Sequence, residues 1–282
     1  MYRILEKVSL NPTVTKMVLE APLAAKKARA GQFVILRADE NGERIPLTVA
    51  GTDREKGSLT VIFQVVGATT EKLNRLEAGE YVQDVAGPLG RATELEGIRR
   101  ACVVGGGVGC AIALPVVQAL RENGAQVDSV IGFRSKDLVI LEDEFSAASD
   151  RVFLMTDDGS AGRKGLVTDA LKENIENGAG YDTVFCIGPL IMMKFVCLLT
   201  KQYGIRTVVS MNPIMIDGTG MCGGCRLTVN GQTRFACVDG PDFDGHEIDF
   251  DEAIRRNKMY AGFEKEAREK TCSLFRQAES TH

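Results

Sequence analysis

Two patterns of hydrophobic and polar positions divide this chain. Before about residue 96, short β-prone runs alternate loosely between apolar and polar residues, and turn pairs such as Asn41-Gly42 and Lys56-Gly57 separate them. The strand candidates are 13–20, 33–37, 47–50 and 59–66, and the one helix candidate is 69–76. Several short strands at this spacing predict a small antiparallel β-barrel domain over residues 1–96.

From about residue 98, buried-type strands alternate with helices. The expected strands are 101–104, 127–133, 152–156, 183–187 and 207–210, and the expected helices are 111–122, 142–146, 166–174 and 190–203. This alternation predicts an α/β domain over residues 97–210, with a parallel sheet covered on both faces. A segment rich in glycine and cysteine follows over 211–250. The last part, 251–282, is expected to form a single helix from about 251 to 278.

Composition narrows the function classes. A net charge of −4 favours no nucleic-acid partner. His246 is the only histidine inside the chain, which argues against Ser-His-Asp hydrolases and multi-histidine zinc enzymes. No apolar run is long enough for a membrane span, and the first residues lack a signal-peptide core. We therefore expect a cytoplasmic protein whose eight cysteines are thiols or metal ligands.

Three of those cysteines have the spacing of a metal site. Cys222 and Cys225 form a C-x2-C pair in a glycine-rich loop, and a hairpin predicted around Asn230-Gly231 would return Cys237 to the pair. The plant-type iron–sulfur spacing is C-x4-C-x2-C followed by a distant cysteine, and Asp217 occupies its first position. The pattern predicts a [2Fe–2S] cluster held by one carboxylate and three thiolates. A zinc ion with the same four ligands, or a loop whose thiols are there by chance, is the alternative.

The barrel carries two candidate flavin-binding motifs. Arg44 precedes Pro46, Leu47 and Thr48; the arginine can contact a pyrophosphate, and the hydroxyl of Thr48 can approach a flavin N5. Between a strand and the predicted helix lies Gly67-Ala68-Thr69-Thr70, where Gly67, Thr69 and Thr70 would form a helix N-terminus suited to phosphate. An exposed arginine and an ordinary helix cap are the alternatives.

The α/β domain carries a glycine run, 105–109, between a strand and a helix. Gly106, Gly107, Val108 and Gly109 are expected to lie against a dinucleotide phosphate, although Cys110 departs from the strict G-x-G-x-x-G pattern and a simple tight turn is the alternative.

Two later strand ends complete this candidate nucleotide site. Asp157 and Asp158 could bind a ribose, and Cys186, Gly188 and Pro189 lie at an edge where ligands of open sheets bind. Arg134 and Lys136 could instead hold a 2′-phosphate, which leaves NAD against NADP open.

Together these motifs resemble the ferredoxin-reductase-like flavoproteins over nearly the whole chain. The resemblance rests on Arg44-x-Pro46-Leu47-Thr48, Gly67-x-x-Thr70, Gly87-Pro88-Leu89-Gly90, the run 105–109 and Cys186-x-Gly188-Pro189. The cluster segment, which ends Cys237-Val238-Asp239-Gly240-Pro241, is similar to the electron-transfer subunit of dihydroorotate dehydrogenase. There the first ligand is a cysteine. The aspartate resembles instead the small subunits of NADH-dependent reduced ferredoxin:NADP oxidoreductases, which are electron-bifurcating complexes.

The resemblance implies FAD on the barrel, NAD(H) on the sheet, and a larger partner subunit that carries further flavin and iron–sulfur clusters. It places hydride transfer near Thr48, with Cys186 beside the nicotinamide as a packing residue and not a nucleophile. A dihydroorotate or sulfide dehydrogenase remains an alternative complex. A non-enzymatic, zinc-stabilised binding module on a nucleotide-binding fold is the alternative from another class.

Overall fold

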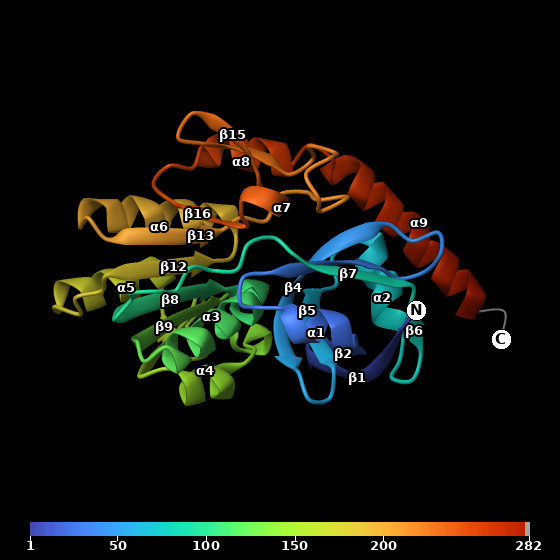
Figure 1. The fold of residues 1–282 in the computed structure, drawn as a ribbon, viewed down its shortest axis with the longest axis horizontal. Helices are drawn as coiled ribbons and strands as arrows, with labels where there is room; N and C mark the ends of the chain where they lie inside the picture. The colour runs from blue at the N-terminus through green and yellow to red at the C-terminus, as the bar shows by residue number, and fades with distance from the viewer. Residues whose placement is uncertain (280–282) are drawn as a thin grey trace.

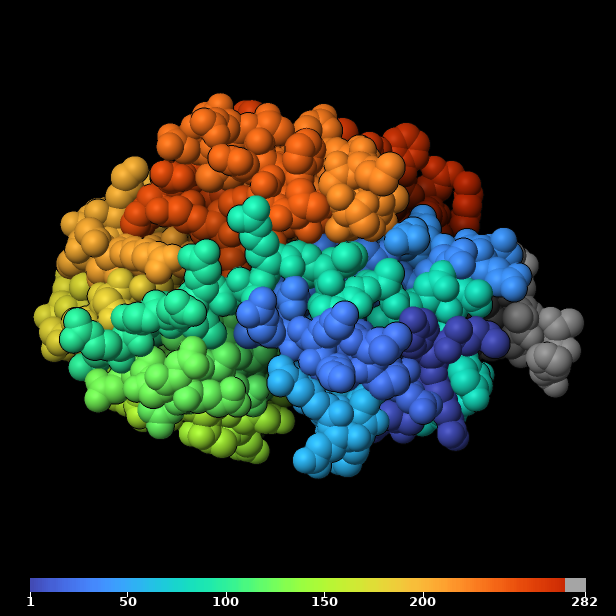
Figure 2. Space-filling model, in the orientation of Figure 1, coloured from blue at the N-terminus to red at the C-terminus, as the bar shows by residue number. Residues whose placement is uncertain are grey.

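The structure, a computed structural model, describes residues 1–279 and the side chains of residues 1–271. Its N-terminal part is one curled antiparallel sheet, and its central part is a parallel sheet covered by helices (Figure 1). The segment after residue 210 lies across one side of both (Figure 2). The predicted order of a flavin-type barrel, an α/β domain and a small C-terminal segment is confirmed as the fold class.

The first sheet has the strand order β6-β1-β2-β5-β4-β3-β7. Only Gln83 separates the two edge strands, β6 and β7, in the chain, so the sheet must curl to bring its edges near each other. These edges are not hydrogen-bonded to each other, so the barrel is open along one seam. Its elements are β1 (Tyr2–Asn11), β2 (Val14–Glu20), α1 (Pro22–Lys27), β3 (Phe33–Arg37), β4 (Arg44–Asp53), β5 (Ser58–Gln64), α2 (Ala68–Arg75), β6 (Tyr81–Val82) and β7 (Asp84–Leu89).

The second sheet has the order β11-β10-β9-β8-β12-β13-β16. Consecutive residues of β8 enter different cores: Val103 packs into the cluster on one face of the sheet and Val104 into the cluster on the other. The elements are β8 (Arg100–Gly106), α3 (Cys110–Glu122), β9 (Gln126–Phe133), α4 (Glu142–Ala148), β10 (Arg151–Thr156), β11 (Arg163–Lys164), α5 (Val167–Glu176), β12 (Thr183–Ile187), α6 (Leu190–Gln202) and β13 (Arg206–Ser210).

This strand order creates a switch point. From β8 the chain first adds β9 and β10 on one side and then adds β12 and β13 on the other. The crossovers diverge at the carboxyl ends of β8 and β12, which is where open α/β sheets bind ligands. The glycine run leaves β8 at this point and forms a short 3-10 turn, Gly107–Gly109, before α3.

The cluster segment begins with a loop and the predicted hairpin. Strands β14 (Arg226–Val229) and β15 (Gln232–Phe235) turn at Asn230 and Gly231, whose φ angles of 48° and 71° are those of a tight hairpin turn. The short helix α7 (Ala236–Asp239) carries Cys237. The acidic stretch that follows contains a strand that the sequence pattern did not predict. This strand, β16 (Asp242–Asp244), pairs antiparallel with β13.

The expectation of a single last helix is wrong. Helix α8 (Phe250–Asn257) ends in a turn over 258–260, and a second helix, α9 (Ala261–Glu279), follows. Bonds from Lys258 N to Arg255 O and from Met259 N to Arg256 O tighten the chain out of α-helical geometry. This break lets α9 run toward α2, where Arg268 pairs with Glu71 at 2.9 Å (Figure 1). Within residues 1–279, no helix combines the length and apolarity that crossing a membrane requires.

Candidate functional site

The two candidate flavin motifs lie next to each other on the barrel. Thr69 donates a 2.6 Å hydrogen bond to Glu43, so the start of α2 is held beside the start of β4, where Arg44 is exposed. Thr70 Oγ1 accepts hydrogen bonds from the amides of Gly67 and Val66. A Cβ at Gly67 would meet no atom within 4 Å, so the backbone here is open to a ligand. This open helix start beside an arginine fits a pyrophosphate.

The rest of the Arg44 motif runs along β4 opposite β3. Pro46, Leu47 and Thr48 pair with Ile35, Val34 and Phe33, and all three are partly buried. Thr48 is thus held in the interior of the sheet beside a strand whose other neighbour, β7, leads into Gly87–Gly90. The position is rigid, as a residue that orients a cofactor requires.

At the switch point, the glycine run meets the end of β12. A Cβ at Gly109 would lie 2.5 Å from the Ile187 carbonyl oxygen and 2.8 Å from Gly188 Cα. Gly106 Cα lies 3.2 Å from the position that a Gly188 Cβ would take. Gly107 has a φ of 55° and open space in front of it. Val108 packs partly buried on the core, and Pro189 caps α6. The structure therefore brings both predicted nucleotide motifs to one edge.

The acidic pair lies at the same edge, one strand beyond β9. The Asp158 carboxylate accepts a 2.6 Å bond from the Ser160 hydroxyl, and Ser160 Oγ accepts from the Lys136 amide at 2.7 Å. The Ser160 contacts hold the pKa of the Asp158 carboxyl below its usual range. Asp157, the residue before Asp158, is exposed. The loop that carries Asp158 and the loop that carries Lys136 are thus joined through Ser160.

Cys186 lies inside the protein and not on the open edge. Its thiol is fully buried in an apolar core with Val104, Met193 and Val196, and burial raises its pKa well above the usual value. A protonated, enclosed thiol is a packing group and a poor nucleophile. Its contact with a nicotinamide stays a prediction; the next residue, Ile187, touches the glycine run.

The four proposed metal ligands come from the loop and from α7. Cys225 Sγ and Cys237 Sγ are 3.3 Å apart and almost completely buried. Asp217 lies at the other end of the loop, where its carboxylate accepts from the amides of Thr219 and Cys222, both at 2.8 Å. Cys222 is exposed. Within the described side chains no three such groups are already gathered tightly enough to hold a metal ion.

The chemistry of these donors nevertheless fits a metal cluster. Amide donors, that of Thr219 foremost, hold the pKa of Asp217 below its usual range, so it is a carboxylate. Burial, together with the neighbouring Cys225, raises the pKa of Cys237 to about 12. Without metal the Cys237 thiol stays protonated, and a metal ion would release that proton on binding. Two adjacent thiols, the exposed thiol of Cys222 and an ionised carboxylate are four donors of the kind that a cluster needs, and the glycine loop can wrap around them.

The cluster loop packs directly on the barrel. A Cβ at Gly218 would lie 2.8 Å from both Ile35 and Leu89, so only glycine allows this approach. Beyond Cys237, Arg91 donates through its amide to Gly240 O at 2.7 Å and through Nε to Val238 O at 3.0 Å. The segment that holds the candidate cluster is thus fastened to the sheet that carries the flavin motifs.

A partly buried carboxylate completes this junction. Asp242, the first residue of β16, accepts a 2.6 Å bond from Thr93 of the barrel and pairs with Ser210 at the end of β13. Burial raises its pKa from the ordinary 3.8 to about 6. Asp242 therefore joins the barrel, the parallel sheet and the cluster segment.

We expect Asp242→Asn to stabilise the protein at pH 7.5 and to do so less at low pH. Because the folded-state pKa is raised, the contribution of Asp242 to the free energy of unfolding is fully present below about pH 4. It is lost as the pH rises through 6 and the carboxylate ionises inside the protein. Asparagine does not ionise and therefore avoids the cost of a charged side chain here, which reaches up to about 3 kcal/mol. The check is the free energy of unfolding of both proteins between pH 4 and 8. A difference that does not change with pH would contradict the assignment.

Two family models match this chain. The iron–sulfur cluster binding domain of dihydroorotate dehydrogenase B matches residues 212–249, and the oxidoreductase NAD-binding domain matches residues 103–198. These ranges cover the cluster loop, the hairpin and α7 in one case and the switch-point edge in the other.

Whole-chain relatives agree with these models. A protein of Thermotoga maritima described as a dihydroorotate dehydrogenase B (NAD(+)), electron transfer subunit homolog is 48% identical over 262 residues, 93% of this chain and 92% of that protein. The electron transfer subunit of Shouchella clausii is 36% identical over 244 residues, 83% of this chain and 91% of that one. This chain belongs to the family of dihydroorotate dehydrogenase B electron-transfer subunits.

This chain superposes with a TM-score of 0.91 on a solved structure of an NADH-dependent reduced ferredoxin-NADP oxidoreductase. That structure was studied for flavin-based electron bifurcation. It is 45% identical and covers 96% of this chain and 97% of that chain. The predicted oxidoreductase class and the predicted cofactors, FAD, NAD(H) and an iron–sulfur cluster, are confirmed. These matches favour the oxidoreductase over the competing hypothesis of a non-enzymatic zinc-stabilised module.

The sequence interpretation missed several residues of this site. Arg91, Thr93 and Asp242 make the junction, yet each is an ordinary polar residue without a motif. Arg226 and Arg256 donate to carbonyl oxygens of the cluster loop at 3.1 and 3.3 Å. Arg226 directly follows Cys225 in the sequence, so its place near the cluster loop could have been predicted. Arg256 is distant in sequence and only the fold brings it to the loop.

Proposed function

We propose that this chain is the small subunit of an electron-bifurcating NADH-dependent reduced ferredoxin:NADP oxidoreductase. In this role it moves electrons between NAD(H), FAD on the barrel and a [2Fe–2S] cluster held by Asp217, Cys222, Cys225 and Cys237. The observation that carries the proposal is the contact of the cluster loop with the barrel, at Gly218 against Ile35 and Leu89. A contact of this kind brings the two cofactor sites near each other, and electron transfer between two cofactors requires a short distance between them.

The chain's own residues would bind and orient the groups. Arg44 and the start of α2 would hold the pyrophosphate of FAD, with Thr48 at the flavin ring. Gly106–Gly109, Gly188 and Pro189 would admit the nicotinamide dinucleotide to the switch point, with Asp157 or Asp158 at a ribose. FAD supplies the exchange between two-electron and one-electron chemistry, and the cluster supplies one-electron transfer. The fully buried Cys186 would support the nucleotide edge from behind.

The test is spectroscopic. Anaerobically purified chain should show flavin absorbance together with iron–sulfur absorbance, and NADH should bleach both. A loaded protein with bound metal and no visible colour would overturn the cluster assignment. The rates at which NADH and NADPH reduce the flavin, measured in competition, would show which nucleotide the chain uses. We also propose a cytoplasmic location, which agrees with the seven described cysteines all being free thiols.

A second candidate is electron transfer for dihydroorotate oxidation, which the names of the relatives favour. The residue at position 217 favours the first candidate, since an aspartate stands where the resemblance to dihydroorotate dehydrogenase subunits expects a cysteine. The native complex would separate the two. Reduction of NAD⁺ by dihydroorotate supports the second candidate, whereas NADPH-driven reduction of ferredoxin with NAD⁺ supports the first.

We further propose that a larger flavin and iron–sulfur subunit docks over the cluster. Ile216, Met221 and Val238 are 55%, 89% and 39% exposed, and each is the chain neighbour of a proposed ligand. Exposed apolar side chains gathered at one site mark a surface that a partner covers. The partner would thereby bring its own redox centre close to the cluster and exclude water from it.

Met221→Glu should weaken binding of the large subunit about tenfold or more, because a charge would be buried in an apolar contact. Leu23→Glu is the matched control. Leu23 is 82% exposed but lies on α1 of the barrel, away from the cluster loop. Calorimetry with the purified partner measures both. Equal affinities for the two variants would show that the partner binds elsewhere.

A further inference from the structure

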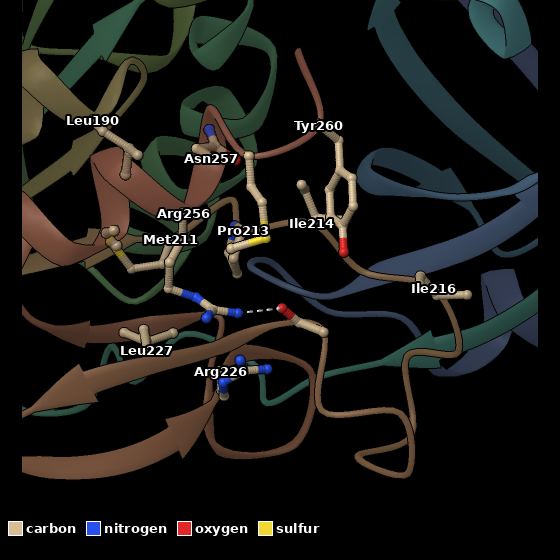
Figure 3. A pocket seen from close by; sticks show the side chains of 13 residues that line it. Leu190, Met211, Pro213, Ile214, Ile216, Arg226, Leu227, Arg256, Asn257 and Tyr260 are labelled. Carbon is tan, nitrogen blue, oxygen red and sulfur yellow. Dashed lines mark hydrogen bonds between the residues drawn. The ribbon is translucent and has the colours of Figure 1, made fainter. Parts of the chain in front are cut away.

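Two arginines outside the ligand set reach the backbone of the C-x2-C loop. Arg226, the first residue of β14, donates from Nη1 to Gly223 O at 3.1 Å. Arg256, on the last turn of α8, donates from Nη2 to Gly224 O at 3.3 Å (Figure 3). They come from different elements and bond two consecutive peptide groups, 223–224 and 224–225, of the stretch between Cys222 and Cys225.

The first of these peptide groups also contacts a ligand sulfur. The Gly224 amide lies 3.4 Å from Cys222 Sγ and donates to it. Because Gly223 C=O and Gly224 N–H belong to one peptide unit, the Arg226 guanidinium, this peptide and the Cys222 sulfur form a continuous chain of hydrogen bonds. A cation at one end polarises such a chain and strengthens the donor at the other. The Arg226 charge therefore strengthens the hydrogen bond that the Gly224 amide donates to the Cys222 sulfur.

The second arginine is committed to the loop in preference to an acidic neighbour. Glu252 lies one helical turn before Arg256, at the spacing that favours a Glu–Arg pair. Yet Glu252 Oε2 is buried and has no hydrogen-bond partner, and Arg256 bonds Gly224 O. Arg256 is partly buried, in the wall of an apolar groove with Ile214 and Tyr260. In such surroundings its charge is screened less than on an open surface.

We propose that Arg226 and Arg256 set the reduction potential of the iron–sulfur cluster. Net charge and hydrogen bonds to the sulfurs are the main determinants of cluster potentials. A site held by four anionic ligands gains a further negative charge when it accepts an electron. Two guanidinium groups on the loop favour this reduced form and so raise the potential. The inference rests on the proposed function, and both arginines are positioning residues that touch no reacting atom.

The experiment compares Arg256→Gln and Arg226→Gln with Arg255→Gln in the complete, cluster-loaded chain. Arg255 is the adjacent residue on α8; it is exposed and interacts with Asp251, away from the loop carbonyls. All three variants lose the same formal charge. We expect the first two to change the one-electron equilibrium of the cluster about tenfold, which is about 59 mV to more negative potential. Arg255→Gln should stay near the wild type. Arg256→Lys, which keeps the charge, should recover most of the shift.

An EPR-monitored redox titration reads the potential directly, independent of turnover. Potentials in Arg226→Gln and Arg256→Gln that equal that of Arg255→Gln would overturn the proposal, whether all three shift or none does. Arg226 is exposed, so its variant tests the proposal even if Arg256→Gln folds poorly. A wild-type chain without a cluster signal after reduction would instead reject the proposed function.

Discussion

Replacing Cys225 with serine (Cys225→Ser) should remove the cluster and leave the flavin reducible by NADH. Cys225 is 2% exposed and lies against Cys237, so its loss takes away one half of the buried sulfur pair. A hydroxyl is a poor replacement for a thiolate as an iron ligand. We expect bound iron and electron flow to the partner to fall more than about tenfold, while flavin content stays unchanged. Iron analysis and stopped-flow absorbance measure the two effects.

Two further variants make this result specific. Cys197→Ala removes another buried thiol, from α6 and outside the ligand set, and should keep a full complement of iron. Asp217→Cys should keep the cluster and change its potential, because a thiolate would replace an oxygen ligand. Iron loss in Cys197→Ala would mean that any core thiol matters, and an unchanged potential in Asp217→Cys would remove Asp217 from the ligand set.

Gly109→Ala should give the second large effect, on both folding and NADH binding. Its methyl group would lie 2.5 Å from the Ile187 carbonyl oxygen, a backbone atom that can move only if the ends of β8 and β12 separate. Overpacking of this kind costs about 1–3 kcal/mol of unfolding free energy. It also opens the edge at which the nucleotide binds, so we expect about tenfold weaker binding of NADH.

The matched control is Gly106→Ala. A methyl group there would first meet Met192 Sδ at 2.4 Å, the end of a flexible side chain that can rotate away. We therefore expect a smaller loss of stability and affinity than in Gly109→Ala. Denaturant titration and fluorescence titration with NADH compare the two. An equal loss in both variants would indicate that the whole run tolerates no side chain, independent of the β12 contact.

Much of this architecture could be predicted from local patterns. Strand 33–37 and strand 183–187 have the predicted ends because each is a short, β-branched or aromatic run between turn residues. The hairpin at Asn230-Gly231 was predictable because its turn requires residues that tolerate positive φ. The ligand set was predictable because three ligands lie in one loop and the fourth, Cys237, follows directly after one hairpin.

The remaining features depend on partners distant in sequence. Strand β16 is Asp242-Phe243-Asp244, an acidic triplet with weak strand propensity, and it forms because the free edge of β13 accepts it. The helix break at 258–260 arises where α9 is drawn toward Glu71 of α2. The burial of Cys186 follows from the pleat of β12, which turns that thiol into the core on one face of the sheet and the side chain of Ile187 into the core on the other.

The antiparallel edge strand also closes the cluster segment into a loop of its own. The chain leaves the parallel sheet at Met211 and returns at Pro241, and Met211 N donates to Pro241 O at 2.9 Å. The residues between them form a loop whose two ends are already joined, so this loop can open and refold while the strands on either side stay paired. The flavin and nucleotide domains can thus fold first, and cluster insertion can follow as a late, local ordering step. Chelation of the iron should leave a folded flavoprotein.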